Sequence, residues 1–165
     1  MPIANRTARL LVRNKKTLAI AESCTGGLLS NLLTNLPGSS KFFRLSIIPY
    51  ANQFKTILLK VSDKILKTKG AVSKETVLIM AKNIRSLAKT DFGLSVSGIA
   101  GPGGATKIKP VGLVYIGLSS GKKTTCKKFI FKGSRAQIKK QAANAALELL
   151  LKQLNNQRNH ILKSV

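Results

Sequence analysis

The sequence has very little of the residues that build most metal sites and most hydrolase triads. Its 165 residues include one His, His160, and two cysteines, Cys24 and Cys126, that lie far apart in the chain. This spacing does not fit a zinc site, and one His in a polar tail does not favour a His-based triad, so we expect no metal. A chain of this length can bury roughly 70% of its unfolded surface. It therefore needs no disulfide or metal to fold.

Long apolar runs are also absent. No run approaches the ~20 residues that a membrane-spanning helix needs, and the segment from Met1 to Arg6 lacks the apolar core of a signal peptide. We therefore expect a cytoplasmic protein with no membrane partner. We further expect a single domain over residues 1–165, with a core at about 6–154 and a tail at 155–165.

Acidic residues are scarce: five Asp and Glu stand against 29 Lys and Arg, which gives a formal net charge of +24. Such a field attracts nucleic acid, anionic lipid or a small anionic substrate. The basic residues are spread along the whole chain, and six Phe and two Tyr offer little for base stacking. A nucleic-acid partner and a simple bias toward Lys and Asn both fit, and we expect nucleic-acid binding to be at most non-specific.

Apolar periodicity and turn residues predict an alternation of helices and strands. The expected helices cover 3–14, 26–36, 52–61, a short segment after Ser62, a segment after Ser73, and 134–154. The expected strands cover 17–20, 45–50, 92–97, 111–119 and 124–131. This order favours an α/β fold, a three-layer α/β/α sandwich with helices on both faces of a mixed, mostly parallel sheet.

The most informative segment runs from Ala21 to Gly27, between the first strand and the next helix. It places hydroxyls, a thiol and two glycines where the amides of a helix N-terminus are free to bind an anion. Ser23 has two interpretations, a helix-capping or turn serine or a nucleophile. Cys24 is either a rival nucleophile or a small buried residue.

Polar segments at 22–27, 50–55 and 97–104 each follow a predicted strand. Ligands of open α/β sheets collect beyond the carboxyl ends of strands, so we expect these segments to form one pocket. The glycine-rich segment at 97–104 matches neither a P-loop nor a dinucleotide-binding motif.

A serine nucleophile in this chain needs a base other than His. A desolvated lysine can lose its proton and act as that base. Lys55 is the lysine that we select, because Tyr50, Asn52 and Lys55 lie together just after a predicted strand. Glu22 either positions Lys55 or another cation, or is a structural carboxylate.

Several motifs together resemble the C-terminal domain family of the competence/damage-inducible protein CinA, in order from about residue 6 to 154. They are Ala21-Glu22-Ser23-Cys24-Thr25-Gly26-Gly27, Pro37-Gly38-Ser39-Ser40, Tyr50-Ala51-Asn52-Gln53-Phe54-Lys55, Gly70-Ala71-Val72-Ser73, Ser97-Gly98-Ile99-Ala100-Gly101-Pro102-Gly103-Gly104 and Lys109-Pro110-Val111-Gly112.

The resemblance implies a nicotinamide-nucleotide amidase: a metal-free and cofactor-free hydrolysis of nicotinamide mononucleotide to nicotinate mononucleotide and ammonia, in pyridine-nucleotide salvage, by a homodimer. It assigns the attack to Ser23, the proton relay to Lys55, and assisting roles to Tyr50 and to Thr25 at the oxyanion. Arg135 would meet the phosphate. The residues expected to contact substrate are Glu22, Gly26, Gly27, Asn52, Ser97, Gly98, Gly101, Gly103, Lys109 and Arg135.

The chain departs from the family pattern at two relevant positions. Ala51 stands where the family usually has Ser or Thr, and Ser134 stands where Asp usually precedes Arg135. Two other functions stay open: a catalytically vestigial basic module linked to DNA uptake or damage response, and an amidase for a different anionic amide.

Overall fold

Five strands form one sheet in the order β2-β1-β3-β4-β5. The strands are β1 (Leu18–Glu22), β2 (Phe43–Ile47), β3 (Phe92–Gly98), β4 (Leu113–Ser120) and β5 (Lys123–Ile130). β1 pairs in parallel with β2 and β3, whereas β4 runs antiparallel to both β3 and β5. Four strands thus share one direction, and the predicted mixed, mostly parallel sheet is confirmed.

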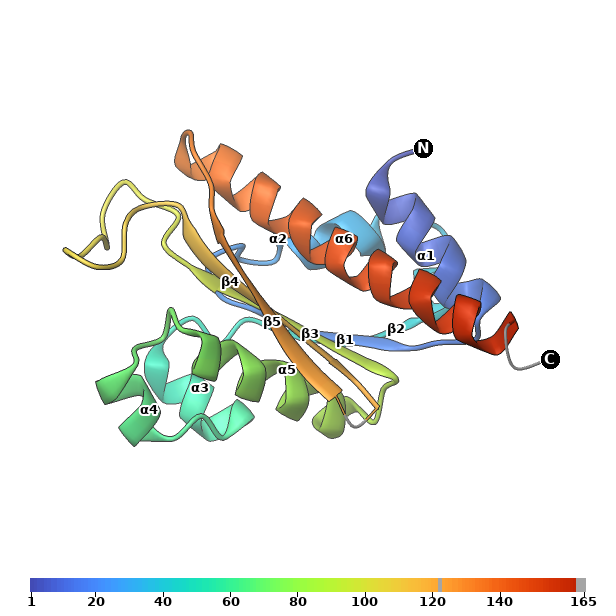
Figure 1. Ribbon diagram of the computed structural model, residues 1–165, viewed down its shortest axis with the longest axis horizontal. Helices are drawn as coiled ribbons and strands as arrows, with labels where there is room; N and C mark the ends of the chain where they lie inside the picture. The colour runs from blue at the N-terminus through green and yellow to red at the C-terminus, as the bar shows by residue number, and fades with distance from the viewer. Residues whose placement is uncertain (122, 163–165) are drawn as a thin grey trace.

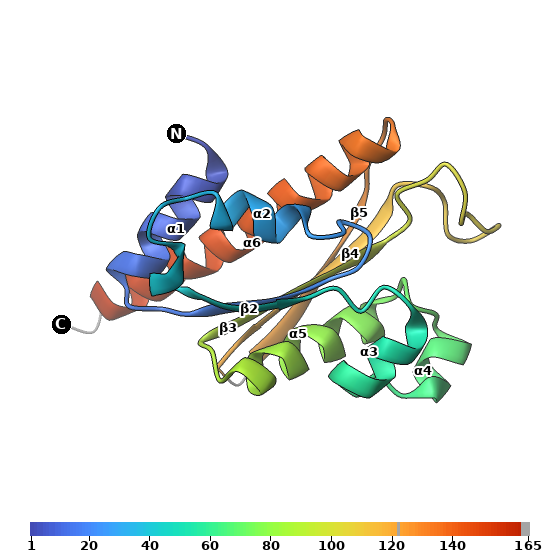
Figure 2. The ribbon, with the colours of Figure 1, turned by 180° about the vertical axis from the view of Figure 1, so that it is seen from behind.

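Helices cover both faces of this sheet. The computed structural model describes residues 1–121 and 123–162, with side chains up to residue 156. One helical layer holds α1, α2 and α6, and the other holds α3, α4 and α5 (Figures 1 and 2). The helices are α1 (Ile3–Arg13), α2 (Leu28–Thr34), α3 (Asn52–Leu59), α4 (Asp63–Thr68), α5 (Lys74–Ala88) and α6 (Arg135–Leu162), with a 3₁₀ turn at Ser39–Lys41. The side chain of His160 and the end of the predicted tail, 163–165, lie outside the described residues.

Alternation along the interior strand β1 divides the core into two parts. Leu18 and Ile20 pack with the apolar residues of α1, α2 and α6, whereas Ala19 and Ala21 pack with Met80 of α5 on the other face. Because side chains alternate along a strand, Glu22 lies on the same face of the sheet as Leu18 and Ile20. The fold therefore places a carboxylate beneath α2.

Left-handed backbone conformations explain where two helices begin and end differently from the prediction. Gly26 and Gly27 have φ of 60° and 92°, a region that glycine enters easily, so α2 begins at Leu28 instead of residue 26. Lys60, with φ of 55°, ends α3 at Leu59 instead of residue 61.

The last helix is longer than predicted. Ser134 and Gln137 form a capping box: Ser134 N donates to Gln137 Oε1 at 2.8 Å, and Gln137 N donates to Ser134 Oγ at 3.4 Å. From this cap, α6 continues to Leu162, so residues 155–162 of the predicted tail are helical. No helix in the described part of the chain has an apolar stretch of the length that a bilayer requires.

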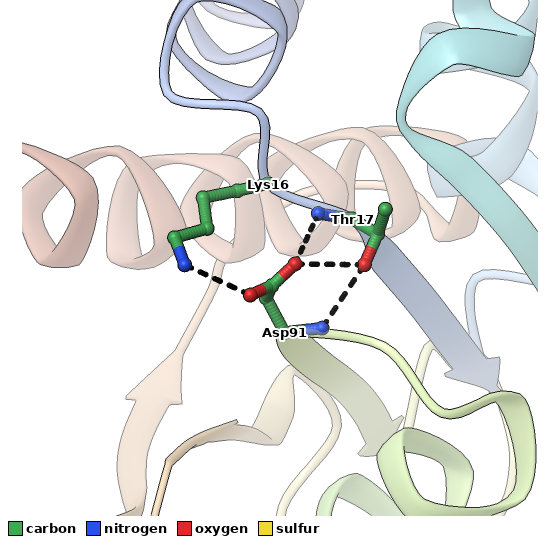
Figure 3. A network of polar contacts seen from close by, with 3 residues as sticks. All are labelled: Lys16, Thr17 and Asp91. Carbon is green, nitrogen blue, oxygen red and sulfur yellow. Dashed lines mark hydrogen bonds and ion pairs between the residues drawn. The ribbon is translucent and has the colours of Figure 1, made fainter.

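The amino ends of β1 and β3 are tied together by a small polar network (Figure 3). Asp91, just before β3, accepts hydrogen bonds from Lys16 Nζ at 2.9 Å, Thr17 N at 2.9 Å and Thr17 Oγ1 at 2.8 Å. Burial opposes ionisation of Asp91, but these hydrogen bonds outweigh it and hold the pKa of Asp91 below its usual value.

Asp91→Asn should lower the free energy of unfolding by ~1 kcal/mol at pH 7, because the ion pair is partly exposed and screened by solvent. The unfolded-state pKa of Asp is about 3.9, so the stabilisation is present above that pH. It is lost as the pH falls through the lower pKa of the folded state. Urea unfolding at pH 7 and at pH 2 measures this. An equal difference between wild type and variant at both pH values would contradict the assignment.

Candidate active site

The three polar segments that follow β1, β2 and β3 meet in one pocket, as predicted from the sequence. Its volume is about 240 Å³. The residues that line it are Ser23, Cys24, Tyr50, Asn52, Lys55, Ala71, Val72, Ser97, Gly98, Ile99, Ala100, Gly101, Gly103, Gly104 and Arg135. Parallel pairing of β1 with β2 and β3 causes this convergence, because it puts the carboxyl ends of the three strands at one edge of the sheet.

Glu22 lies outside the pocket and caps α2. Its carboxylate is fully buried and accepts hydrogen bonds from the N–H groups of Gly27 at 2.9 Å, Leu29 at 3.2 Å and Ser30 at 2.8 Å. The hydroxyl of Ser30 also donates to it, and Ser46 Oγ of β2 lies 2.6 Å from that hydroxyl. The helix N-terminus stabilises the negative charge. Glu22 is therefore a structural carboxylate, and the expected contact with substrate is wrong.

The glycine amides of the turn are also occupied. Gly27 N donates to Glu22, and Gly26 N donates to the carbonyl of Ser23 at 3.1 Å. Thr25 is fully buried, and its Oγ1 has no hydrogen-bond partner among the described residues. None of these three residues lines the pocket, so the structure does not place them where the sequence interpretation needed them.

Ser23 lies at the pocket and does not cap α2. It follows β1 directly and lines the pocket. The residue at the N-cap of α2 is Gly27, which makes no side-chain cap, and the carboxylate of Glu22 takes the amides that a capping serine would have used. The capping interpretation of Ser23 is therefore wrong.

Cys24 is a poor competitor for that role. Its side chain is buried, and burial raises the pKa of its thiol to about 12. Because the thiolate is the reactive form of cysteine, burial makes Cys24 a weaker nucleophile at neutral pH.

Lys55 is the most unusual side chain of the pocket. Only 1% of it is exposed, although it lies in the first turns of α3. Its Nζ donates to the carbonyl of Pro49 at 2.7 Å and to that of Tyr50 at 2.8 Å. Burial lowers the pKa of Lys55 from the ordinary lysine value of 10.5, and the nearby Cys24 opposes this only in part. Burial thus shifts the protonation equilibrium of Lys55 toward the neutral amine.

Arg135 closes the pocket from the start of α6. Its Nη1 donates to the carbonyl of Gly101 at 2.7 Å, and its Nη2 donates to the hydroxyl of Tyr50 at 3.2 Å. These two contacts orient the guanidinium although Ser134 replaces the acidic residue of the family pattern. The hydroxyl of Tyr50 points to Arg135, whereas its carbonyl holds Lys55.

The glycine-rich segment forms the opposite wall of the pocket. A Cβ at Gly98 would lie 2.6 Å from Val114 Cγ2 and 2.8 Å from the carbonyl oxygen of Leu113, so only glycine fits there. Ser97 is buried, and its hydroxyl donates to the carbonyl of Ala71 at 2.8 Å, which joins this wall to the segment before α5. At Gly103, in contrast, a Cβ would meet no atom within 4 Å.

Lys109 does not reach the pocket. Its Nζ donates to the carbonyls of Lys69 and Val72, at 2.5 Å and 2.8 Å. Lys109 therefore ties the loop after β3 to the connection between α4 and α5, and the expected contact with substrate is wrong.

Sequence reasoning missed the contributions of the backbone. The carbonyls of Pro49 and Tyr50 that hold Lys55, and the pocket wall formed by Ala71 and Val72, carry no side-chain signal of their own. Only the motif around Ala71 pointed to that region.

The protein is an α/β sandwich with a pocket at the carboxyl ends of its parallel strands. A serine and a buried lysine in this pocket define the class of the protein. Residues 1–154 match the sequence model of the CinA C-terminal domain, and the chain belongs to that family.

Similar proteins agree with this assignment. A CinA-like protein of Endomicrobium trichonymphae is 50% identical over 152 residues, which cover 92% of this chain and 36% of the relative. A CinA-like protein of Syntrophus aciditrophicus is 46% identical and covers 89% of this chain and 35% of its own length. The chain thus spans about a third of these curated relatives.

Solved structures match almost the whole chain. A CinA superfamily protein from Klebsiella pneumoniae superposes with a TM-score of 0.90 at 28% identity, covering 93% of this chain and 96% of the other. The competence/damage inducible protein CihA from Agrobacterium tumefaciens gives 0.89 at 34% identity, with 93% of each chain covered.

Glu22→Gln should destabilise the protein by roughly 2–3 kcal/mol, because the new amide NH₂ faces N–H donors and the charge that attracts them is lost. The exposed Glu148→Gln removes the same charge and should change stability by less than ~0.5 kcal/mol. Urea unfolding measures both. Equal effects of the two substitutions would contradict the capping role.

Proposed function

We propose that this protein is an amidohydrolase that converts nicotinamide mononucleotide to nicotinate mononucleotide and ammonia, with Ser23 as nucleophile and Lys55 as base. The observation that carries the proposal is the environment of Lys55. A neutral amine has two N–H bonds and one lone pair. Two backbone carbonyls accept hydrogen bonds from Nζ, which leaves the lone pair for a third direction. Ser23 lines the same pocket.

Lys55 then moves one proton in each half of the reaction. It takes the proton of Ser23 as Oγ forms a bond to the amide carbon, and the carbonyl oxygen becomes an oxyanion. When the C–N bond breaks, Lys55 gives that proton to the nitrogen, which leaves as ammonia. In the second half, Lys55 takes a proton from water as the water oxygen attacks the ester. It returns the proton to Ser23, and the acid is released.

A backbone amide next to Ser23 supports the oxyanion. Cys24 lines the pocket, and its N–H group donates to no backbone carbonyl among the described residues, in contrast to the N–H group of Gly26. One such donor at an oxyanion is typically worth about 3 kcal/mol of activation free energy. We therefore assign the oxyanion to the main chain at Cys24 and not to the side chain of Thr25.

Two cations at the start of α6 suit the phosphate of the substrate. Arg135 lines the pocket, and Lys139 lies one turn further along the helix, with its Nζ 3.4 Å from the place of a Cβ at Gly26. A planar arginine fork together with a nearby lysine charge suits a phosphate group. Nicotinamide riboside, which lacks the phosphate, should therefore be a poorer substrate.

Ser23→Ala and Lys55→Ala should each lower the rate of ammonia release from nicotinamide mononucleotide by at least about 10³-fold, because nucleophile and base act as a unit. A coupled ammonia assay with the purified protein measures this. Ser86→Ala and Lys64→Ala, which change exposed residues outside the pocket, should keep the wild-type rate. Absence of wild-type turnover, or full activity of Ser23→Ala, would refute the proposed mechanism.

The pH dependence should report Lys55. Because burial lowers the pKa of its amine, kcat/KM should rise with pH and level off below the 10.5 of ordinary lysine, as the amine loses its proton in the free enzyme. Steady-state kinetics from pH 6 upward, in buffers of constant ionic strength, give this profile. A rate that falls with increasing pH over this range would mean that protonated Lys55 is the active form.

A further inference from the structure

A second polar cavity lies at the amino end of β3, at the opposite end of the strand from the Ser23 pocket. Its volume is about 440 Å³, and its charged lining consists of Lys16, Arg85, Lys89 and Asp91. It is formed where α5 ends and β3 begins, beside the turn after β4. It shares no lining residue with the Ser23 pocket, so the proposed amidase leaves it without a role.

The backbone of α5 at Arg85 lies close against strand β3 at this cavity. On the adjacent strand β3, a Cβ at Gly93 would lie 2.1 Å from the carbonyl oxygen of Ala81 and 2.6 Å from Arg85 Cβ. Glycine at this position therefore lets α5 lie directly on the sheet. The base of the Arg85 side chain is fixed by this close packing.

No hydrogen bond or ion pair of the Arg85 guanidinium is found within residues 1–121 and 123–156. Its Nε is buried without a hydrogen bond, and the one ion pair among the described residues joins Lys16 and Asp91 instead. A buried cationic donor without a partner raises the free energy of the folded protein. Two parallel hydrogen bonds from a guanidinium to an anion lower it.

Asp91 does not serve as that anion. Lys16 and Thr17 already occupy both of its carboxylate oxygens. Two of the last four carbonyls of α5 are satisfied as well, because Lys89 N and Thr90 N donate to the carbonyls of Ser86 and Arg85. Once Lys16 and Asp91 neutralise each other, Arg85 and Lys89 leave the cavity with two uncompensated positive charges.

We propose that this cavity binds a phosphate group, with the planar fork of Arg85 making the directional contacts and Lys89, one turn further along the chain, supplying a mobile charge. The ligand class is a small phosphate-bearing anion. The cavity is large enough for more than the phosphate itself.

Inorganic phosphate, titrated into ¹⁵N-labelled protein at constant ionic strength maintained with sodium chloride, tests the proposal. Backbone amides from Arg85 to Phe92 and at Gly121 should shift and saturate. Arg85→Gln should weaken this binding at least tenfold, and Lys89→Gln by a smaller factor. Lys64→Gln removes an exposed charge on α4 and should bind phosphate like wild type. This control distinguishes binding at the cavity from attraction of phosphate by the net positive charge of the protein.

Arg135→Gln separates the cavity from the proposed substrate site, because it removes the phosphate contact there and should leave the shifts at Arg85 unchanged. The exposed Lys89 can be replaced without disturbing the core, so the test stands even where Arg85→Gln lowers stability. Shifts confined to residues 23–27 and 97–104, shifts absent from α5, or equal affinity of wild type and both cavity variants would overturn the proposal.

Discussion

The arrangement of the candidate active site depends on the buried carboxylate of Glu22. By accepting the amides of Gly27, Leu29 and Ser30, it fixes α2 at the carboxyl end of β1. It thereby satisfies the helix N-terminus without Ser23. Ser23 is thus left at the pocket without a capping role, next to the amide of Cys24, which donates to no backbone carbonyl among the described residues. A link through Ser30 to Ser46 of the edge strand extends the same network to β2.

Lys55 meets a complementary constraint on the other side of the pocket. An ammonium group in this buried position would lose much of its hydration, and two carbonyls replace only part of it. Ala51 is the N-cap of α3, the helix that carries Lys55, and makes no side-chain cap. Replacing the Ser or Thr of the family pattern with Ala therefore removes a helix cap, which lowers the free energy of unfolding by about 1 kcal/mol. Likewise, Arg135 is oriented by Gly101 and Tyr50, so Ser134 leaves its position intact.

The fold was largely predictable, because strongly periodic segments such as α5 and the β4–β5 hairpin carry their own signal. The convergence of Ser23, Lys55 and Ser97 also followed from strand order. The roles of Glu22, Thr25 and Lys109 did not follow, since a carboxylate or amine near a turn has the same sequence pattern whether it binds substrate or backbone. Helix ends at Gly27 and Lys60 depended on left-handed conformations that spacing does not encode.

The central claim is that Ser23 forms a covalent ester with the acid half of the amide. Mass spectrometry of peptides from protein quenched in acid during turnover of nicotinamide mononucleotide tests it most directly. The account predicts that the added mass of the acyl group lies on Ser23 and disappears when substrate is exhausted. An adduct on Cys24, or turnover in which the Ser23 peptide stays unmodified throughout, would contradict it.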